Sequence, residues 1–162
     1  MEDNKKQISA RSIPQRAPRS KTYRQGLFTP KNPEKYIGDV TKIRYMSSWE
    51  LEAHSFFDRN DRVIRWSSEP IAIPYIKPTD GKIHKYYPDY YVEYIDKDKN
   101  VVRELMECKP KSQTRAPRAN HKHKLYEQVT FAVNQAKWAA AIEWCKQRGI
   151  SFRVITENSI FR

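Results

Sequence analysis

Two segments of the chain repeat apolar residues at three- and four-residue intervals, which places those residues on one face of a helix. In the first segment, Ser47 and Glu50 form a capping box, the signature of a helix start. The segment ends in the polar run 59–61, and its apolar positions are Trp49, Ala53, Phe56 and Phe57. This pattern predicts an amphipathic helix from residue 47 to residue 59.

The second apolar repeat spans residues 125–148 and is followed by Gly149, a residue that suits the position after a helix. Its apolar positions are Leu125, Val129, Val133, Ala136, Ala140 and Trp144. The pair Asn134-Gln135 in the middle leaves open a division into two helices. We therefore predict either one long helix or two shorter ones here.

Segments rich in β-branched and aromatic residues predict strands over residues 62–66, 71–76, 89–95, 101–109 and 150–155. The first two are one bent strand or two short ones, and Pro70 and Pro74 favour an edge or a bulge there. The polar run 96–100 predicts a hairpin loop. The order α-β-β-β-α-β predicts an α/β fold, with a small mixed sheet flanked by helices.

The first 44 residues follow neither pattern and contain eleven basic residues, four acidic residues and four prolines. Because proline fixes φ and removes a hydrogen-bond donor, we expect an extended segment with little structure of its own. We divide the chain into a basic arm, residues 1–36, and a compact domain, residues 37–162. The arm is either a solvated tail or a segment that lies along DNA or docks into an assembly.

The whole chain carries 31 Lys and Arg against 19 Asp and Glu, a formal net charge of +12. Such an excess favours polyanions such as nucleic acid, although an acidic membrane surface or an acidic protein would satisfy it equally. No apolar run approaches the roughly 18 residues that span a bilayer. Cys108 and Cys145 resemble buried thiols of a reducing compartment. These features predict a soluble intracellular protein with no membrane partner.

Candidate chemistry lies in Pro88-Asp89 and in Glu107-Cys108-Lys109. Since side chains alternate along a strand, Glu107 and Lys109 share one face and Cys108 lies on the other. If strands 89–95 and 101–109 pair through their loop, the start of the first lies beside the end of the second. Two carboxylates and one ammonium would then converge at one edge of the sheet.

This arrangement suits hydrolysis of a phosphodiester bond. Two carboxylates can hold Mg²⁺ or Mn²⁺, hard cations that prefer oxygen ligands, against a phosphate. Lys109 can orient the attacking water or stabilise the developing negative charge. Glu50, early in the preceding helix, is a candidate third ligand, although its place in the capping box also explains it without any chemistry.

These residues resemble the P-D…(D/E)-x-K signature of restriction-endonuclease-like nucleases, whose core has the α-β-β-β-α-β order. The chain is more specifically similar to the head completion nucleases of T4-type tailed phages. That similarity covers roughly residues 30–157 and is carried by segments such as 31–39, 43–50, 66–69, 107–111, 137–141 and 148–157.

The resemblance implies a metal-dependent DNA endonuclease with no small-molecule cofactor, in which Glu50, Asp89 and Glu107 bind the metal and Lys109 assists. It also implies action late in phage assembly, in the host cytoplasm or at the head–neck region of the virion. The arm would then contact portal or neck proteins. A non-catalytic neck protein that grips DNA, and a transposon-end or junction-resolving nuclease, are alternatives.

The same side chains have purely structural interpretations. Asp89 suits the turn after a proline, and Glu107 with Lys109 suits a solvated ion pair, worth about 0–1 kcal/mol. Glu69 is a further acidic candidate near the same sheet edge, where a turn role explains it as well. The basic residues after the second strand are expected to contact phosphates of double-stranded DNA, or else form a mobile loop: Lys111, Arg115 and Arg118.

Overall fold

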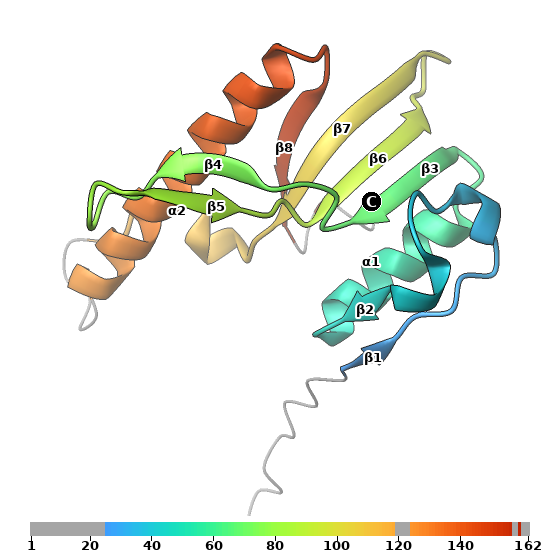
Figure 1. Ribbon diagram of the computed structural model, residues 1–162, viewed down its shortest axis with the longest axis horizontal. Coiled ribbons are helices and arrows are strands. Elements are labelled where there is room, and N and C mark those ends of the chain that lie inside the picture. The colour runs from blue at the N-terminus through green and yellow to red at the C-terminus, as the bar shows by residue number, and fades with distance from the viewer. Residues whose placement is uncertain (1–24, 119–123, 157–158, 160–162) are drawn as a thin grey trace, which may run out of the picture.

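The computed structural model describes residues 25–118, 124–156 and 159, and its centre is a four-stranded sheet in the order β3-β6-β7-β8. The strands are β3 (Val63–Ser68), β6 (Tyr90–Ile95), β7 (Val101–Cys108) and β8 (Ser151–Ile155). The first three pair antiparallel, and β8 runs parallel to β7, so the predicted small mixed sheet is confirmed. Figure 1 shows the four strands side by side.

Two helices flank this sheet, as predicted: α1 (Ser48–Arg59) and α2 (Lys124–Lys146). The capping box starts α1, because the Ser47 hydroxyl oxygen accepts a hydrogen bond of 3.1 Å from the Glu50 N–H. The division of the second helix at Asn134 is wrong. Asn134 lies buried in the middle of α2, and the four alanines of residues 136–141 after it favour a continuous helix. No helix in the described ranges is both long and apolar enough to cross a membrane.

The two faces of the sheet bury separate apolar clusters, as the alternation along β7 illustrates. Met106 packs with Ala53 and Phe57 of α1 in one cluster. Leu105, its neighbour in the strand, packs with Trp138 of α2 in the other. The odd-numbered residues of β7 therefore face α2. This parity decides which side of the sheet carries Glu107.

A hairpin that sequence analysis predicted only in part lies between β3 and β6. Its strands are β4 (Ile73–Ile76), the second of the two short strands allowed above, and β5 (Ile83–Tyr86). They form a sheet of their own, and Pro74 occupies a strand with one partner only, which suits its missing N–H. Tyr75 and Tyr86 pack into the α2-side cluster, and Figure 1 shows the hairpin extending alongside α2.

Residues 25–45 lie against the α1 side of the domain. Short strands β1 (Gly26–Leu27) and β2 (Arg44–Tyr45) pair, with 3₁₀ turns η1 (Pro33–Lys35) and η2 (Val40–Lys42) between them. Phe28 and the buried Ile43 join the α1-side cluster. The described part of the predicted arm, residues 25–36, is thus attached to the domain, which differs from the extended segment that we expected. Residues 1–24 lie outside the described residues.

Asp58, at the end of α1, holds this N-terminal segment in place. Its side chain is 1% exposed, and its two carboxylate oxygens accept hydrogen bonds from the backbone N–H groups of Lys31 and Asn32 at 2.8 and 3.0 Å. The Asn32 side-chain amide donates in turn to the Asp58 carbonyl oxygen at 2.9 Å. A buried carboxylate with these partners fixes the path of residues 31–32 across the helix end.

Replacing Asp58 with alanine should lower the free energy of unfolding by about 2–5 kcal/mol. The reason is that the backbone N–H groups of Lys31 and Asn32 would have no acceptor in the folded variant. Chemical denaturation measures this change. Asp61→Ala is the matched control, since Asp61 is exposed in the turn that follows α1, and it should change stability by less than about 0.5 kcal/mol. Equal effects of the two substitutions would contradict the anchoring role of Asp58.

Candidate active site

Asp89 lies at the start of β6, directly beside the end of β7. Tyr90 is paired with Met106 in the antiparallel register, so the preceding residue comes level with Glu107. The carboxylate of Asp89 turns toward β7, where its Oδ2 accepts a hydrogen bond of 2.7 Å from the backbone N–H of Cys108. The structure thus brings Asp89 to the Glu107-Cys108-Lys109 segment.

Glu107 is buried, with 4% of its surface exposed, and both of its carboxylate oxygens are engaged. The Tyr86 hydroxyl donates a hydrogen bond of 2.7 Å to Oε2, and the Lys109 ammonium lies 2.8 Å from Oε1. Lys109 directly follows β7 and lies on the same side as Glu107, as the alternation of side chains requires. Asp89, Glu107 and Lys109 therefore form one cluster at the sheet edge, while their roles in chemistry stay predictions.

The charges in this cluster are unbalanced. Burial raises the pKa of Asp89 to about 7, and the nearby negative charge of Glu107 adds to the rise. The Cys108 N–H and the Lys109 ammonium oppose it only in part. Burial on its own would lower the pKa of Lys109, but the charge and hydrogen bond of Glu107, together with the charge of Asp89, raise the pKa of Lys109 overall. The single positive charge of Lys109 thus does not fully compensate the negative charge of the two carboxylates.

A buried carboxylate, Glu107, and a partly buried one, Asp89, that repel each other form a donor set suited to a hard divalent cation. A cation between them would relieve the repulsion that raises the pKa of Asp89. Among the described residues, however, no three His, Cys, Asp or Glu side chains lie in an arrangement that could hold a metal ion. The structure therefore offers a two-carboxylate site, and the third protein ligand expected from the sequence is not in place.

Glu50, the expected third ligand, is turned toward its own helix cap. Its carboxylate accepts hydrogen bonds from the Met46 N–H at 2.8 Å and from the Ser47 hydroxyl at 3.2 Å. Its charge nevertheless contributes to the raised pKa of Asp89, which places it within electrostatic range. Glu50 would have to leave these hydrogen bonds to bind a metal together with Asp89.

Glu69 follows β3 at the same edge of the sheet. Its backbone N–H donates a hydrogen bond of 2.9 Å to the Asp89 carbonyl oxygen, and its φ of 45° lies in the left-handed region. The side chain is exposed. The turn role of Glu69 is therefore visible, and its carboxylate lies in solvent.

The basic residues expected to contact DNA follow β7 in a surface segment. Lys111 begins the short 3₁₀ turn η3 (Lys111–Gln113), and Lys111, Arg115 and Arg118 are all exposed. Exposure in the segment that follows Lys109 in the chain is compatible with phosphate binding, and this role stays a prediction.

Sequence reasoning missed two side chains at the cluster, Tyr86 and Lys137. Tyr86 reaches Glu107 from the hairpin strand β5; its pKa is raised by burial and by the Glu107 charge, so its hydroxyl stays a donor at neutral pH. Lys137 lies over the rings of Tyr75 and Tyr86. The sequence held one indication for Lys137, which is its position directly before Trp138, a residue buried in α2.

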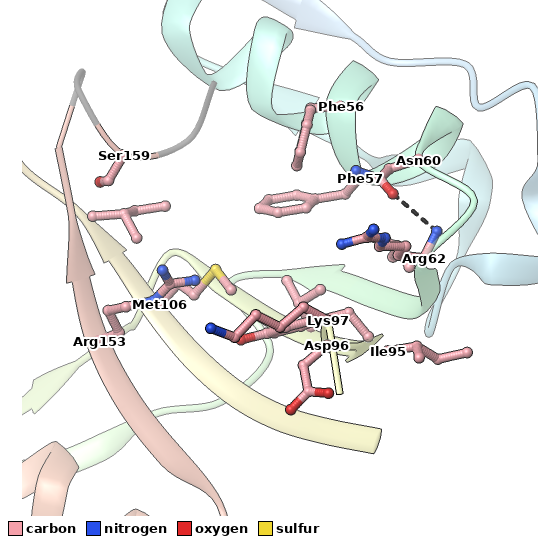
Figure 2. Close-up of a pocket in the computed structure, with 14 residues that line it drawn as sticks. Phe56, Phe57, Asn60, Arg62, Ile95, Asp96, Lys97, Met106, Arg153 and Ser159 are labelled. Atoms are coloured by element: carbon pink, nitrogen blue, oxygen red, sulfur yellow. Dashed lines mark hydrogen bonds between the residues drawn. The ribbon is translucent and has the colours of Figure 1, made fainter. Parts of the chain in front are cut away.

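A separate hollow of about 310 Å³ lies on the other face of the sheet, between the end of α1 and strands β6 to β8. Figure 2 shows Phe56, Phe57 and Met106 on its walls, with Lys97 and Arg153 at its side. Neither Asp89 nor Glu107 lines it. The hollow is therefore distinct from the carboxylate cluster.

The α-β-β-β-α-β core, with carboxylates at the adjoining ends of β6 and β7 and a lysine two residues after the second, defines a restriction-endonuclease-like nuclease fold. The chain belongs to the TnsA-like endonuclease N-terminal family, whose sequence model matches residues 60–157. It is also 37% identical over 142 residues to the head completion nuclease of Enterobacteria phage T4. That alignment covers 83% of this chain and 92% of the phage protein.

The comparisons confirm the resemblance inferred from the sequence and identify the chain as a nuclease relative. The family match includes the cluster of Asp89, Glu107 and Lys109, whereas Glu50 precedes the matched range. The cluster is therefore part of the domain that defines the family.

Proposed function

We propose that this chain is an endodeoxyribonuclease that requires Mg²⁺ or Mn²⁺, bound by Asp89 and Glu107 at the ends of β6 and β7. The single observation that carries this proposal is the partly buried cluster in which the charges of Asp89 and Glu107 repel each other beside Lys109. When bound there, a divalent cation supplies Lewis-acid stabilisation of the phosphate and a more acidic bound water.

Each side chain of the cluster has a defined task in this proposal. Asp89 and Glu107 bind the cation, and Tyr86 fixes the orientation of Glu107 by its 2.7 Å hydrogen bond. Lys109 orients the attacking water or stabilises the charge that develops on the phosphate. Glu50 becomes a further ligand if it exchanges its cap hydrogen bonds for the cation.

DNA is the proposed substrate because the chain has a net charge of +12 and exposed basic residues directly follow the cluster. Lys111, Arg115 and Arg118 are proposed to bind backbone phosphates of the duplex, which positions it without reading sequence.

The purified chain should nick supercoiled plasmid DNA in the presence of Mg²⁺ or Mn²⁺, and EDTA should abolish the nicking, because the carboxylates cannot polarise a phosphate without the cation. Gel electrophoresis of the plasmid forms measures the reaction, and calcium serves as a control cation of different size and geometry. Cleavage that persists in EDTA would contradict the metal requirement.

We further propose that the chain acts late in phage assembly, on packaged DNA or at the portal and neck. The similarity to a protein named head completion nuclease supports this role and a location in the virion or in the host cytoplasm. The basic N-terminal arm, residues 1–36, is the segment proposed to contact portal or neck proteins.

The TnsA-like family match favours a second candidate, a nuclease that acts on transposon ends or on DNA junctions. A comparison of linear duplex, branched and flap substrates separates these roles. Preference for a branched substrate favours the second candidate. Absence of cleavage on all forms, together with stable binding to portal or neck proteins, would instead indicate a structural neck protein.

A further inference from the structure

Lys137 is a half-buried lysine whose surroundings are aromatic. It extends from α2 toward the β4–β5 hairpin, and its Nζ lies 5.8 Å from the centre of the Tyr75 ring and 5.7 Å from that of Tyr86. Both distances lie within the range of a cation–π interaction. The two rings therefore flank the ammonium of a residue that is only partly buried.

The ammonium of Lys137 has no negatively charged partner in the part of the chain that the structure describes. Lys109 differs from it, since its ammonium is already 2.8 Å from a Glu107 carboxylate oxygen. Removing a lysine ammonium from water without an anion beside it costs free energy. Accordingly, burial and the charges of Lys109 and Lys77 lower the pKa of Lys137. Binding of an anion would remove this unfavourable situation.

Lys137 is close to the candidate active site without being part of the carboxylate cluster. The charges of Glu107 and Asp89 both act on it, yet neither carboxylate lies within the 4.0 Å of an ion pair. Its ammonium also shares Tyr86 with Glu107, because the ring of Tyr86 faces Lys137 while its hydroxyl binds the carboxylate. The Lys137 ammonium thus lies one aromatic side chain away from the proposed metal ligand.

We propose that Lys137 binds a backbone phosphate of the DNA substrate, next to the phosphate that is cut. This inference rests on the proposed nuclease function and adds a substrate contact to it. A lysine ammonium is a compact cation with three donors and suits a phosphate oxygen. Lys77, at the end of β4 in the hairpin, adds positive charge on the same side. The alternative is that the stem of Lys137 only covers the two tyrosine rings.

The test compares Lys137→Met with Lys146→Met, an exposed lysine on the same helix nine residues further on, or about 13 Å along the axis. Binding of a fluorescent 20-base-pair duplex is measured in EDTA at several salt concentrations. Lys137→Met should weaken binding about 3- to 10-fold and reduce the slope of log K against log salt by about one. Lys137→Arg should keep the wild-type slope, and Lys146→Met should change neither quantity.

An unchanged affinity and slope in a folded Lys137→Met variant would overturn the proposal and leave the packing role. If methionine impairs folding, Lys137→Gln also removes the charge and is judged by the same slope. Failure of wild-type chain to bind the duplex would overturn the proposal as well. In cleavage assays, Lys137→Met should raise KM with little change in kcat; a fall in kcat alone would overturn the placement beside the cut phosphate.

The binding measurement needs no cleavage, so the two proposals fail separately. If wild-type chain binds DNA but never cuts it, the nuclease proposal fails while the salt slope still tests Lys137. If wild-type chain cuts DNA and Lys137→Met matches it in binding and KM, the inference on Lys137 fails and the nuclease proposal stands.

Discussion

Glu107→Gln should reduce Mg²⁺-dependent nicking by about 10³-fold or more, while binding of DNA in EDTA persists. Loss of groups behind metal ligands commonly costs 10- to 100-fold, and loss of a charged ligand itself should cost more. Glutamine keeps the size of the side chain and can still accept the Tyr86 hydrogen bond, so the fold should survive. Initial rates of plasmid nicking measure the effect.

Glu104→Gln is the matched control for this experiment. Glu104 is also a buried carboxylate of β7, with a tyrosine hydroxyl from Tyr94 at 3.2 Å and the Arg153 guanidinium at 2.9 Å. It lies on the opposite face of the strand, however, because the two positions differ by three residues. Glu104→Gln should therefore keep nicking within a few-fold of wild type. Equal loss in both variants would indicate damage to the sheet rather than to a metal site.

Asp89→Asn should also reduce the rate of nicking by about 10³-fold or more, because it too removes a charged metal ligand. The same substitution should make the metal-free chain more stable at pH 8. The pKa of Asp89 is raised to about 7, so at pH 8 the folded protein holds an ionised carboxylate that it disfavours. Asparagine removes that charge and keeps an oxygen for the Cys108 N–H. A gain in stability with a loss of activity is typical of a strained functional group.

The sign of the pH dependence follows from this raised pKa. The folded state binds the Asp89 proton more tightly than the unfolded state does. Protonation of Asp89 therefore adds to the free energy of unfolding, fully below about pH 4, and this addition is lost as the pH rises through about 7. The stability difference between Asp89→Asn and wild type should therefore grow from pH 4 to pH 8. Thermal unfolding in EDTA measures it, with Asp96→Asn at the other end of β6 as the control. A difference independent of pH would contradict the raised pKa.

Periodic patterns were sufficient to predict the elements of the core. The capping box at Ser47 and the apolar repeat after it placed the start of α1 correctly, and alternation placed Glu107 and Lys109 on one face of β7. These predictions succeeded because each depends on neighbours in the sequence. Asp89 reached Glu107 for the same reason, since a five-residue loop joins two strands that pair in a fixed register.

Contacts between distant segments were not predictable in this way. Tyr86 reaches Glu107 only because the β4–β5 hairpin folds back over the sheet, and no local pattern gives that direction. The contact between Asp58 and residues 31–32 is equally remote in sequence. The position of the Glu50 carboxylate could not be predicted for a different reason. A capping box and a metal site would both use this carboxylate, and the sequence does not say which of the two it joins.

Because Tyr86 donates a hydrogen bond to Glu107, insertions and deletions should be tolerated less well at the base of the β4–β5 hairpin than at its tip. Between Tyr86 and Asp89 stand only two residues, and dropping one would reverse which way the tyrosine ring points relative to the sheet. The distal turn at residues 77–82 contacts neither carboxylate, so that tip can lengthen or shorten without disturbing them. Natural variation in hairpin size within such nucleases should therefore collect at the tip, leaving the spacing at the base constant.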